Sequence, residues 1–238
     1  MHTTIEVPSP ATTARSAART GLGGAIGGLA FAASVLVQNA LRSKFPTNDA
    51  GAPEVLQYYG EHRSATLALA VLMPIGLVGL TTFLGAVIAR VGRGAGRAAA
   101  VRGAFGAAAV IATFTMLTAL DLGIAGYVHR GRAALNVVDG IWVVHNAVFG
   151  LLLAAIGIAL AGLTRAAATS GLISTRWNKA GLVGGALLVA GAMTTPAIID
   201  ASPTMFIGVA GFVVWIAFVI RTSLALLRPS APSIGATS

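Results

Sequence analysis

The chain contains no cysteine. Disulfide bonds, thiolate metal ligands and thiol catalysis are therefore excluded, and any soft-metal site would depend on histidine. Charge is also scarce, because only 10% of the 238 residues are charged, compared with about 25% in an ordinary soluble domain. Hydrophobic residues make up 56% of the chain, which indicates an integral membrane protein.

Crossing a bilayer takes about 20 predominantly apolar residues of helix. The apolar runs of suitable length are 21–41, 65–89, 104–127, 140–164, 180–200 and 204–227. They predict an all-α fold, a polytopic bundle of six transmembrane helices that occupies residues 21–228. The polar segments 1–20 and 229–238 are expected to be disordered cytoplasmic tails.

The basic residues are unevenly divided between the two sides of this predicted bundle. With the amino terminus placed inside, 11 of the 16 basic residues fall in cytoplasmic segments, and the outer loops hold five basic residues against five acids. This is the pattern of the positive-inside rule, so both termini are expected in the cytoplasm. The net charge of +9 then reflects topology, and no nucleic-acid partner is predicted. The expected location is the plasma membrane, with the lipid bilayer as the main partner.

Glycines gather in the first apolar run. Gly24 and Gly28 are spaced four apart, and such a GxxxG pair lets another backbone approach closely within lipid. We expect this face to pack against another helix, within the bundle, in a membrane-protein partner or in a homo-oligomer. The sequence Ala30-Phe31-Ala32 is similar to a signal-peptidase site, but the apolar run continues to Leu41, so retention of this span is favoured.

Asp121 is the only acid inside a long apolar run, and His145 is the only histidine in one. A carboxylate at the centre of a bilayer costs about 2.5–3.5 kcal/mol on insertion scales, so Asp121 requires a partner or a purpose. Helical rise places it roughly level with His145 and Asn146 on the next run. We therefore predict that Asp121 is buried and that His145 or Asn146 is its partner.

Further polar residues are expected in the same outer half of the bundle. The candidates for a ligand or proton site are Asp121, His145, Asn146, Gln38, Asn39 and Thr118. Two interpretations stay open. One is a polar cavity open to the outside, and the other is a set of interhelical hydrogen bonds, each worth about 0.6 kcal/mol.

Two short segments resemble a known group of proteins. The first is Pro53–Arg63, with its Tyr-Tyr-Gly-Glu-His-Arg ending just before a span, and the second is the start of the fifth span, 170–185, around Arg176-Trp177. Both are similar to segments of uncharacterised multi-spanning actinobacterial membrane proteins. The resemblance implies a six-helix fold, and it implies no activity and no functional residue.

Enzyme motifs are missing from the sequence. There is no HExxH and no GxSxG, and no catalytic residue, metal ligand set or cofactor is predicted. The expected function is therefore a non-enzymatic membrane subunit or scaffold that binds through its glycine faces. The alternative is a small-solute or proton-linked transporter that uses an outward-facing polar cavity around Asp121. A membrane-embedded hydrolase, with Asp121 and several histidines as ligands, is a distant third.

Overall fold

The computed structural model describes residues 10–92, 94–131, 134–200 and 202–228. Every regular element in this part of the chain is an α-helix. The helices are α1 (Pro10–Arg42), α2 (Ala52–Glu61), α3 (Arg63–Val91), α4 (Arg97–His129), α5 (Leu135–Thr169), α6 (Thr175–Met193), α7 (Thr195–Ile199) and α8 (Met205–Leu226). The all-α bundle expected from the sequence is thus confirmed.

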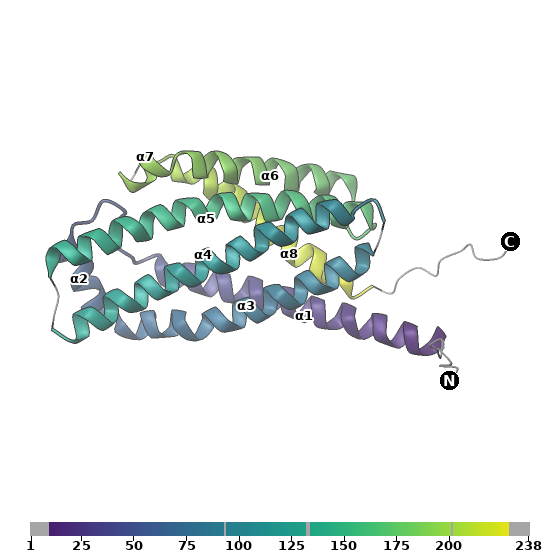
Figure 1. Cartoon of the computed structure of the whole chain (residues 1–238), viewed down its shortest axis with the longest axis horizontal. Coiled ribbons are helices and arrows are strands. Elements are labelled where there is room, and N and C mark those ends of the chain that lie inside the picture. Colours follow the sequence, from purple (N-terminus) through teal and green to yellow (C-terminus); the bar gives the residue numbers. More distant parts are fainter. Residues whose placement is uncertain (1–9, 93, 132–133, 201, 229–238) are drawn as a thin grey trace, which may run out of the picture.

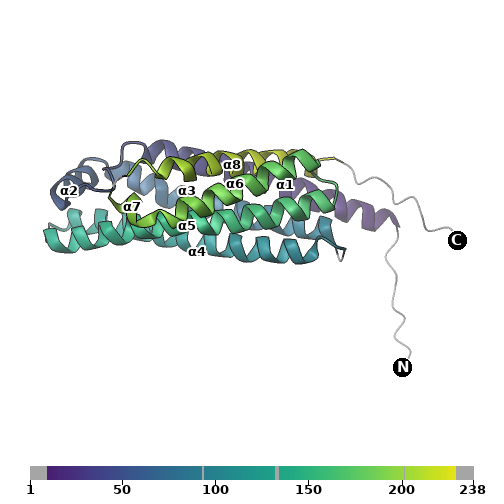
Figure 2. The same cartoon turned by 90° about the horizontal axis from the view of Figure 1, so that it is seen from above.

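The long helices lie side by side and form an elongated bundle (Figure 1). The beginning of α1 and the end of α8 lie at one end of the bundle, and the short helices α2 and α7 lie at the opposite end (Figures 1 and 2). Helix α5 is the central element, since it packs against α2, α3, α4, α6, α7 and α8. Its most apolar stretch is also 67% buried, a larger share than in any other candidate span of the described chain.

Among the described residues, five helices are long and apolar enough to cross a membrane, which supports a multi-pass membrane protein. They are α1 from Ala18, α3, α4, α5 and α8 from Phe206. The predicted span 180–200 differs from the structure, because it is divided into α6 and α7. Pro196 has no backbone N–H to continue the hydrogen bonds of α6, and it lies in the first turn of α7, which begins at Thr195. The first residues of α6 also include Arg176 and Lys179, and α6 is not among the candidate spans of the described chain.

The first helix begins earlier than expected. Residues 10–20 belong to α1, whereas the sequence suggested a disordered tail up to residue 20. Alanine is the strongest helix former, and this segment contains four alanines, so its helical propensity outweighs its lack of apolar periodicity. The predictions for residues 1–9 and 229–238 lie outside the described residues.

The glycine face of α1 lies against two helices of the same bundle. A Cβ on Gly24 would collide with Ala86 of α3 and lie 3.2 Å from Leu226 of α8. A Cβ on Gly28 would lie 2.7 Å from the Phe83 ring. The absent side chains thus permit α1 to approach both neighbours closely, as small residues do in membrane bundles.

Candidate functional site

Asp121 is the centre of a buried polar cluster at the end of the bundle covered by α2. Its side chain, on α4, is 0% exposed. One carboxylate oxygen, Oδ2, accepts a hydrogen bond of 2.5 Å from Nη2 of Arg42, the last residue of α1. The other, Oδ1, accepts a hydrogen bond of 2.7 Å from the Tyr59 hydroxyl on α2. The carboxylate therefore joins three helices and receives charge-assisted hydrogen bonds, which are the strong ones.

His145 is the third group at the carboxylate. Its Nε2 lies 3.2 Å from Oδ1 of Asp121, which is ion-pair distance when the ring is protonated. The contact lies outside hydrogen-bond geometry, so Nε2 has no hydrogen-bond partner among the described residues. The ring stacks on Trp142, one turn earlier on α5, with 4.8 Å between centroids and 8° between planes. Stacking and burial together fix the imidazole beside Asp121.

Asn146 sets the tautomer of His145. Its Nδ2 donates a hydrogen bond of 2.8 Å to the backbone carbonyl of Asn48, so its Oδ1 is left as an acceptor. This oxygen lies 3.3 Å from Nδ1 of His145, which therefore carries a hydrogen. In a neutral ring the lone pair would then be on Nε2, 3.2 Å from Oδ1 of Asp121. A proton on Nε2 gives an ion pair with the carboxylate at this distance.

Aromatic side chains cover part of the cluster. Tyr58, Tyr59 and Trp142 are buried and belong to one apolar cluster with Val55 and Ile124. Arg42 lies 5.6 Å from the centroid of Phe45 and 5.6 Å from that of Phe114, which is cation–π distance. A short helix, α2, thus closes the end of the bundle over a charged centre.

Burial also fixes the protonation of the tyrosines in α2. It raises the pKa of Tyr59 far above its ordinary value of 10.0, and the negative charge of Asp121 raises it further. The pKa of Tyr58 is raised by burial first and by Asp121 second. Both phenols therefore stay neutral at physiological pH, and Tyr59 remains a hydrogen-bond donor to the carboxylate.

A pocket lies against the cluster. It has a volume of about 560 Å³, within the usual range for ligand sites. The lining residues are Asn39, Arg42, Ser43, Phe45, Pro46, Thr47, Asn48, Trp142, His145, Asn146, Phe149, Pro203, Phe206 and Val209. We call it the mouth pocket. Asp121 is not among its described lining residues, so Arg42 and His145 present the charge of the cluster to the pocket.

A deeper chamber adjoins the mouth pocket. It has a volume of about 260 Å³. The lining residues are Asn39, Arg42, Phe114, Leu117, His145, Phe149, Leu152, Leu153, Ile156, Gly208, Val209 and Phe212. The two spaces share five lining residues, Arg42 and His145 among them, so the same basic groups lie at their boundary. Apart from Asn39, Arg42 and His145, the chamber is lined by apolar residues.

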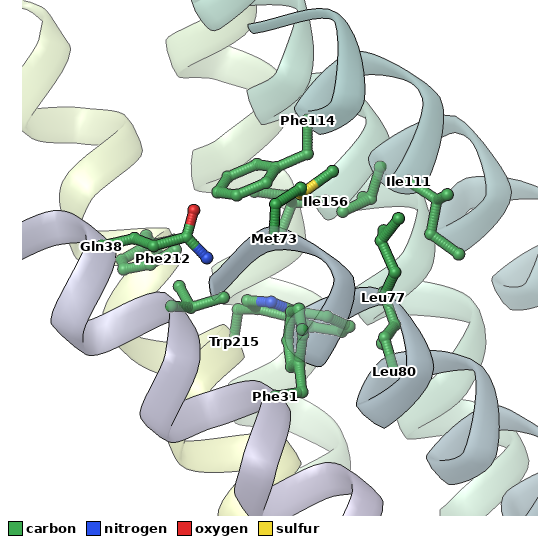
Figure 3. Close-up of a pocket in the computed structure, with 13 residues that line it drawn as sticks. Phe31, Gln38, Met73, Leu77, Leu80, Ile111, Phe114, Ile156, Phe212 and Trp215 are labelled. Atoms are coloured by element: carbon green, nitrogen blue, oxygen red, sulfur yellow. The ribbon is translucent and has the colours of Figure 1, made fainter. Parts of the chain in front are cut away.

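Gln38 lies deeper still, in a small cavity of about 20 Å³. Figure 3 shows its side chain reaching from α1 toward Met73, with Phe114, Phe212 and Trp215 around it. Its Nε2 donates a hydrogen bond of 3.1 Å to Ser34, and its Oε1 has no partner among the described residues. A cavity of this size has room for one water molecule.

The remaining sequence candidates take different places. Asn39 lines both outer spaces and donates to the carbonyl of Val35. Thr118 is buried one turn from Asp121, but its hydroxyl donates to the carbonyl of Phe114 and does not join the cluster. The structure thus brings Asp121, His145 and Asn146 together, adds Asn39 at the pocket wall, and leaves Gln38 and Thr118 outside the charged centre.

Sequence reasoning missed the two strongest partners of Asp121. Neither Arg42 nor Tyr59 is among the candidate site residues that the sequence predicts. A signal was present for Arg42, because an arginine directly at the outer end of an apolar run is unusual under the positive-inside rule. In the described residues, no group of three histidines and acids is placed to hold a metal ion.

Comparisons with known proteins find no match, whether to family models, to curated proteins or to solved structures. The resemblance of Pro53–Arg63 and 170–185 to actinobacterial membrane proteins therefore stays a prediction.

Proposed function

We propose that the chain is a non-enzymatic multi-pass protein of the plasma membrane that binds a small solute and a proton in an outward-facing pocket beside Asp121. This is the transporter alternative of the sequence analysis. The observation that carries it is the position of Arg42 and His145 on the pocket wall, in front of a fully buried carboxylate.

The proposed topology has six spans with both ends of the chain in the cytoplasm. In support, α6 and α7 together run along α5 for much of its length (Figure 1), so they supply a sixth passage beside the five more apolar helices. The arginines at the end of the bundle opposite α2, such as Arg97 and Arg165, match the basic cytoplasmic side. The mouth pocket then faces outward.

Proton binding is supported by the hydrogen bonds around His145. The Asn48 carbonyl orients Asn146, and Asn146 in turn holds the hydrogen on Nδ1 of His145. Nε2 is then the position that gains or loses a proton, and it lies both beside Asp121 and at the pocket wall. A proton bound there changes the charge that the pocket presents to a solute.

The scaffold alternative has less support. It relied on glycine faces that would be available to a partner, but Gly24 and Gly28 are in contact with α3 and α8 of the same chain. These two positions are therefore used for packing inside the bundle.

The absence of cysteine makes an accessibility test direct. Val209 lines both pocket spaces, whereas Val213, one turn further along α8, is not among their described lining residues. A membrane-impermeant maleimide added outside whole cells should label Val209→Cys and not Val213→Cys, because thiols react in water and not in lipid.

This pair is a stringent control, because Val213 is the more exposed side chain, at 61% against 43% for Val209. Stronger labelling of Val213→Cys would mean that this part of α8 faces water generally, and the pocket proposal would fail.

Reporter fusions test the topology separately. Fusions after Ala50 and after Arg97 should place the reporter in opposite compartments, since one position lies next to α2 and the other at the far end of α3 and α4. If both fusions reported the same compartment, the six-span topology would be wrong.

A further inference from the structure

We infer that the ligand of this pocket is a single-chain amphiphile with an anionic head, held with its head at Arg42 and His145 and its chain in the apolar chamber. The inference rests on the proposed function and names the class of ligand.

The first observation is the charge of the cluster. Arg42 is positive, Asp121 is negative, and His145 is positive when both of its ring nitrogens carry hydrogen. With His145 in that form, the sum is one net positive charge. Besides these groups, the titratable side chain in contact with the carboxylate is Tyr59, a neutral donor. A monoanion in the pocket would therefore neutralise the site.

The second observation concerns buried hydrogen-bond donors. Nε of Arg42 is buried without a hydrogen-bond partner among the described residues. Nε2 of His145 also makes no hydrogen bond in this part of the chain, and its ion-pair contact with Oδ1 of Asp121 is 3.2 Å long. Both residues line the mouth pocket and the chamber. Buried donors generally have partners, and a carboxylate or phosphate oxygen is the acceptor that suits two cationic N–H groups.

The third observation is the shape of the cavity. The chamber extends inward from the two cations along apolar side chains such as Leu152, Ile156 and Phe212. Phe114, Ile156 and Phe212 also line the small cavity beside Gln38, so the apolar lining continues to Phe31. From Arg42 to Phe31, α1 rises by roughly 16 Å. A small hydrophilic anion would leave this apolar lining without a counterpart, whereas an alkyl chain would cover it.

The test is a binding measurement on the purified full-length protein in lipid nanodiscs, with radiolabelled decanoate as the probe. Decanoate should bind at least tenfold more tightly than both decanol and acetate, since decanol lacks the charge and acetate lacks the chain. Decyl phosphate should compete with decanoate, whereas two-chain phosphatidate should not.

Two variants of α8 locate the binding. Val209→Phe fills the boundary between mouth and chamber without altering a charge and should weaken decanoate binding at least tenfold. Val213→Phe, the matched control, should change it less than twofold. Equal losses in both variants would indicate adsorption to the outer surface of α8 and would overturn the inference.

Removing the histidine tests the head site. His145→Gln should weaken decanoate binding and leave decanol binding unchanged, because His145 lines the pocket beside Arg42 and would contact only the charged head. Equal affinity for decanol would refute recognition of the head. Equal affinity for acetate would refute an amphiphilic ligand but would leave a pocket for small anions. Failure of the proposed function would look different, because Val209→Cys would then not be labelled.

Discussion

Arg42 and Asp121 form one ion pair, but replacing Arg42 and replacing Asp121 should lower the stability of the protein by different amounts. Arg42→Gln leaves a carboxylate that is 0% exposed, whereas the Arg42 side chain is 16% exposed and can turn its charge toward solvent. Removing one partner of a buried pair costs about 3–5 kcal/mol, and we expect this range for Arg42→Gln. Asp121→Asn keeps the shape and loses charge-assisted hydrogen bonds, so about 1.5–3 kcal/mol is expected.

The assay is a double-variant cycle, with unfolding in mixed micelles followed by tryptophan fluorescence. The two substitutions together should cost less than the sum of the single ones, with a coupling of roughly 1–2 kcal/mol, because the residues are in direct contact. Lys44→Gln, at an exposed basic position close to Arg42, is the control and should stay within about 0.5 kcal/mol of the wild type.

Two results would refute this reasoning. If the costs were additive, the contact would contribute nothing specific. If Asp121→Asn were the more damaging change, the difference in burial between the two side chains would not control the energetics.

Two further predictions concern packing and pH. Gly28→Ala should lower the free energy of unfolding by about 1–3 kcal/mol through overpacking against Phe83. Gly85→Ala, whose added Cβ would have no atom of the described residues within 4 Å, should be neutral or stabilising. Thermal unfolding of both variants in detergent measures the difference. The pKa of Tyr59 is higher in the folded protein than its value of about 10 in the unfolded chain. The contribution of Tyr59 to stability is therefore fully present below about pH 10 and is lost as the pH rises above that value. Wild-type stability should thus fall above pH 10 more steeply than that of Tyr59→Phe, and parallel curves would exclude Tyr59 as the cause.

Much of the fold followed from hydrophobicity alone, because apolar runs of about 20 residues have few alternatives to a membrane helix. The apolar run 180–200 did not predict the break at Pro196 or the polar start of α6, because both are local effects. The early start of α1 has a similar origin, since helix propensity does not require apolar periodicity.

The candidate site could be predicted only in part. The cost of a carboxylate in lipid required Asp121 to be buried, and helical rise brought it level with His145. Arg42 and Tyr59 are 79 and 62 residues away in sequence, and their contacts depend on how α2 folds back over the bundle. Neither the periodicity nor the composition of the sequence predicts that α2 folds back over the bundle.

The order of these partners along the chain also matters for synthesis. Arg42 and Tyr59 both precede Asp121, and at about 5–20 residues per second they are made roughly 3–16 s before it. When α4 reaches the translocon, a cation and a hydroxyl are therefore already available to the carboxylate, before α5 delivers His145. A chain that begins after α2 would present Asp121 to lipid without these partners, so we expect the insertion of α4 to depend on the first third of the protein.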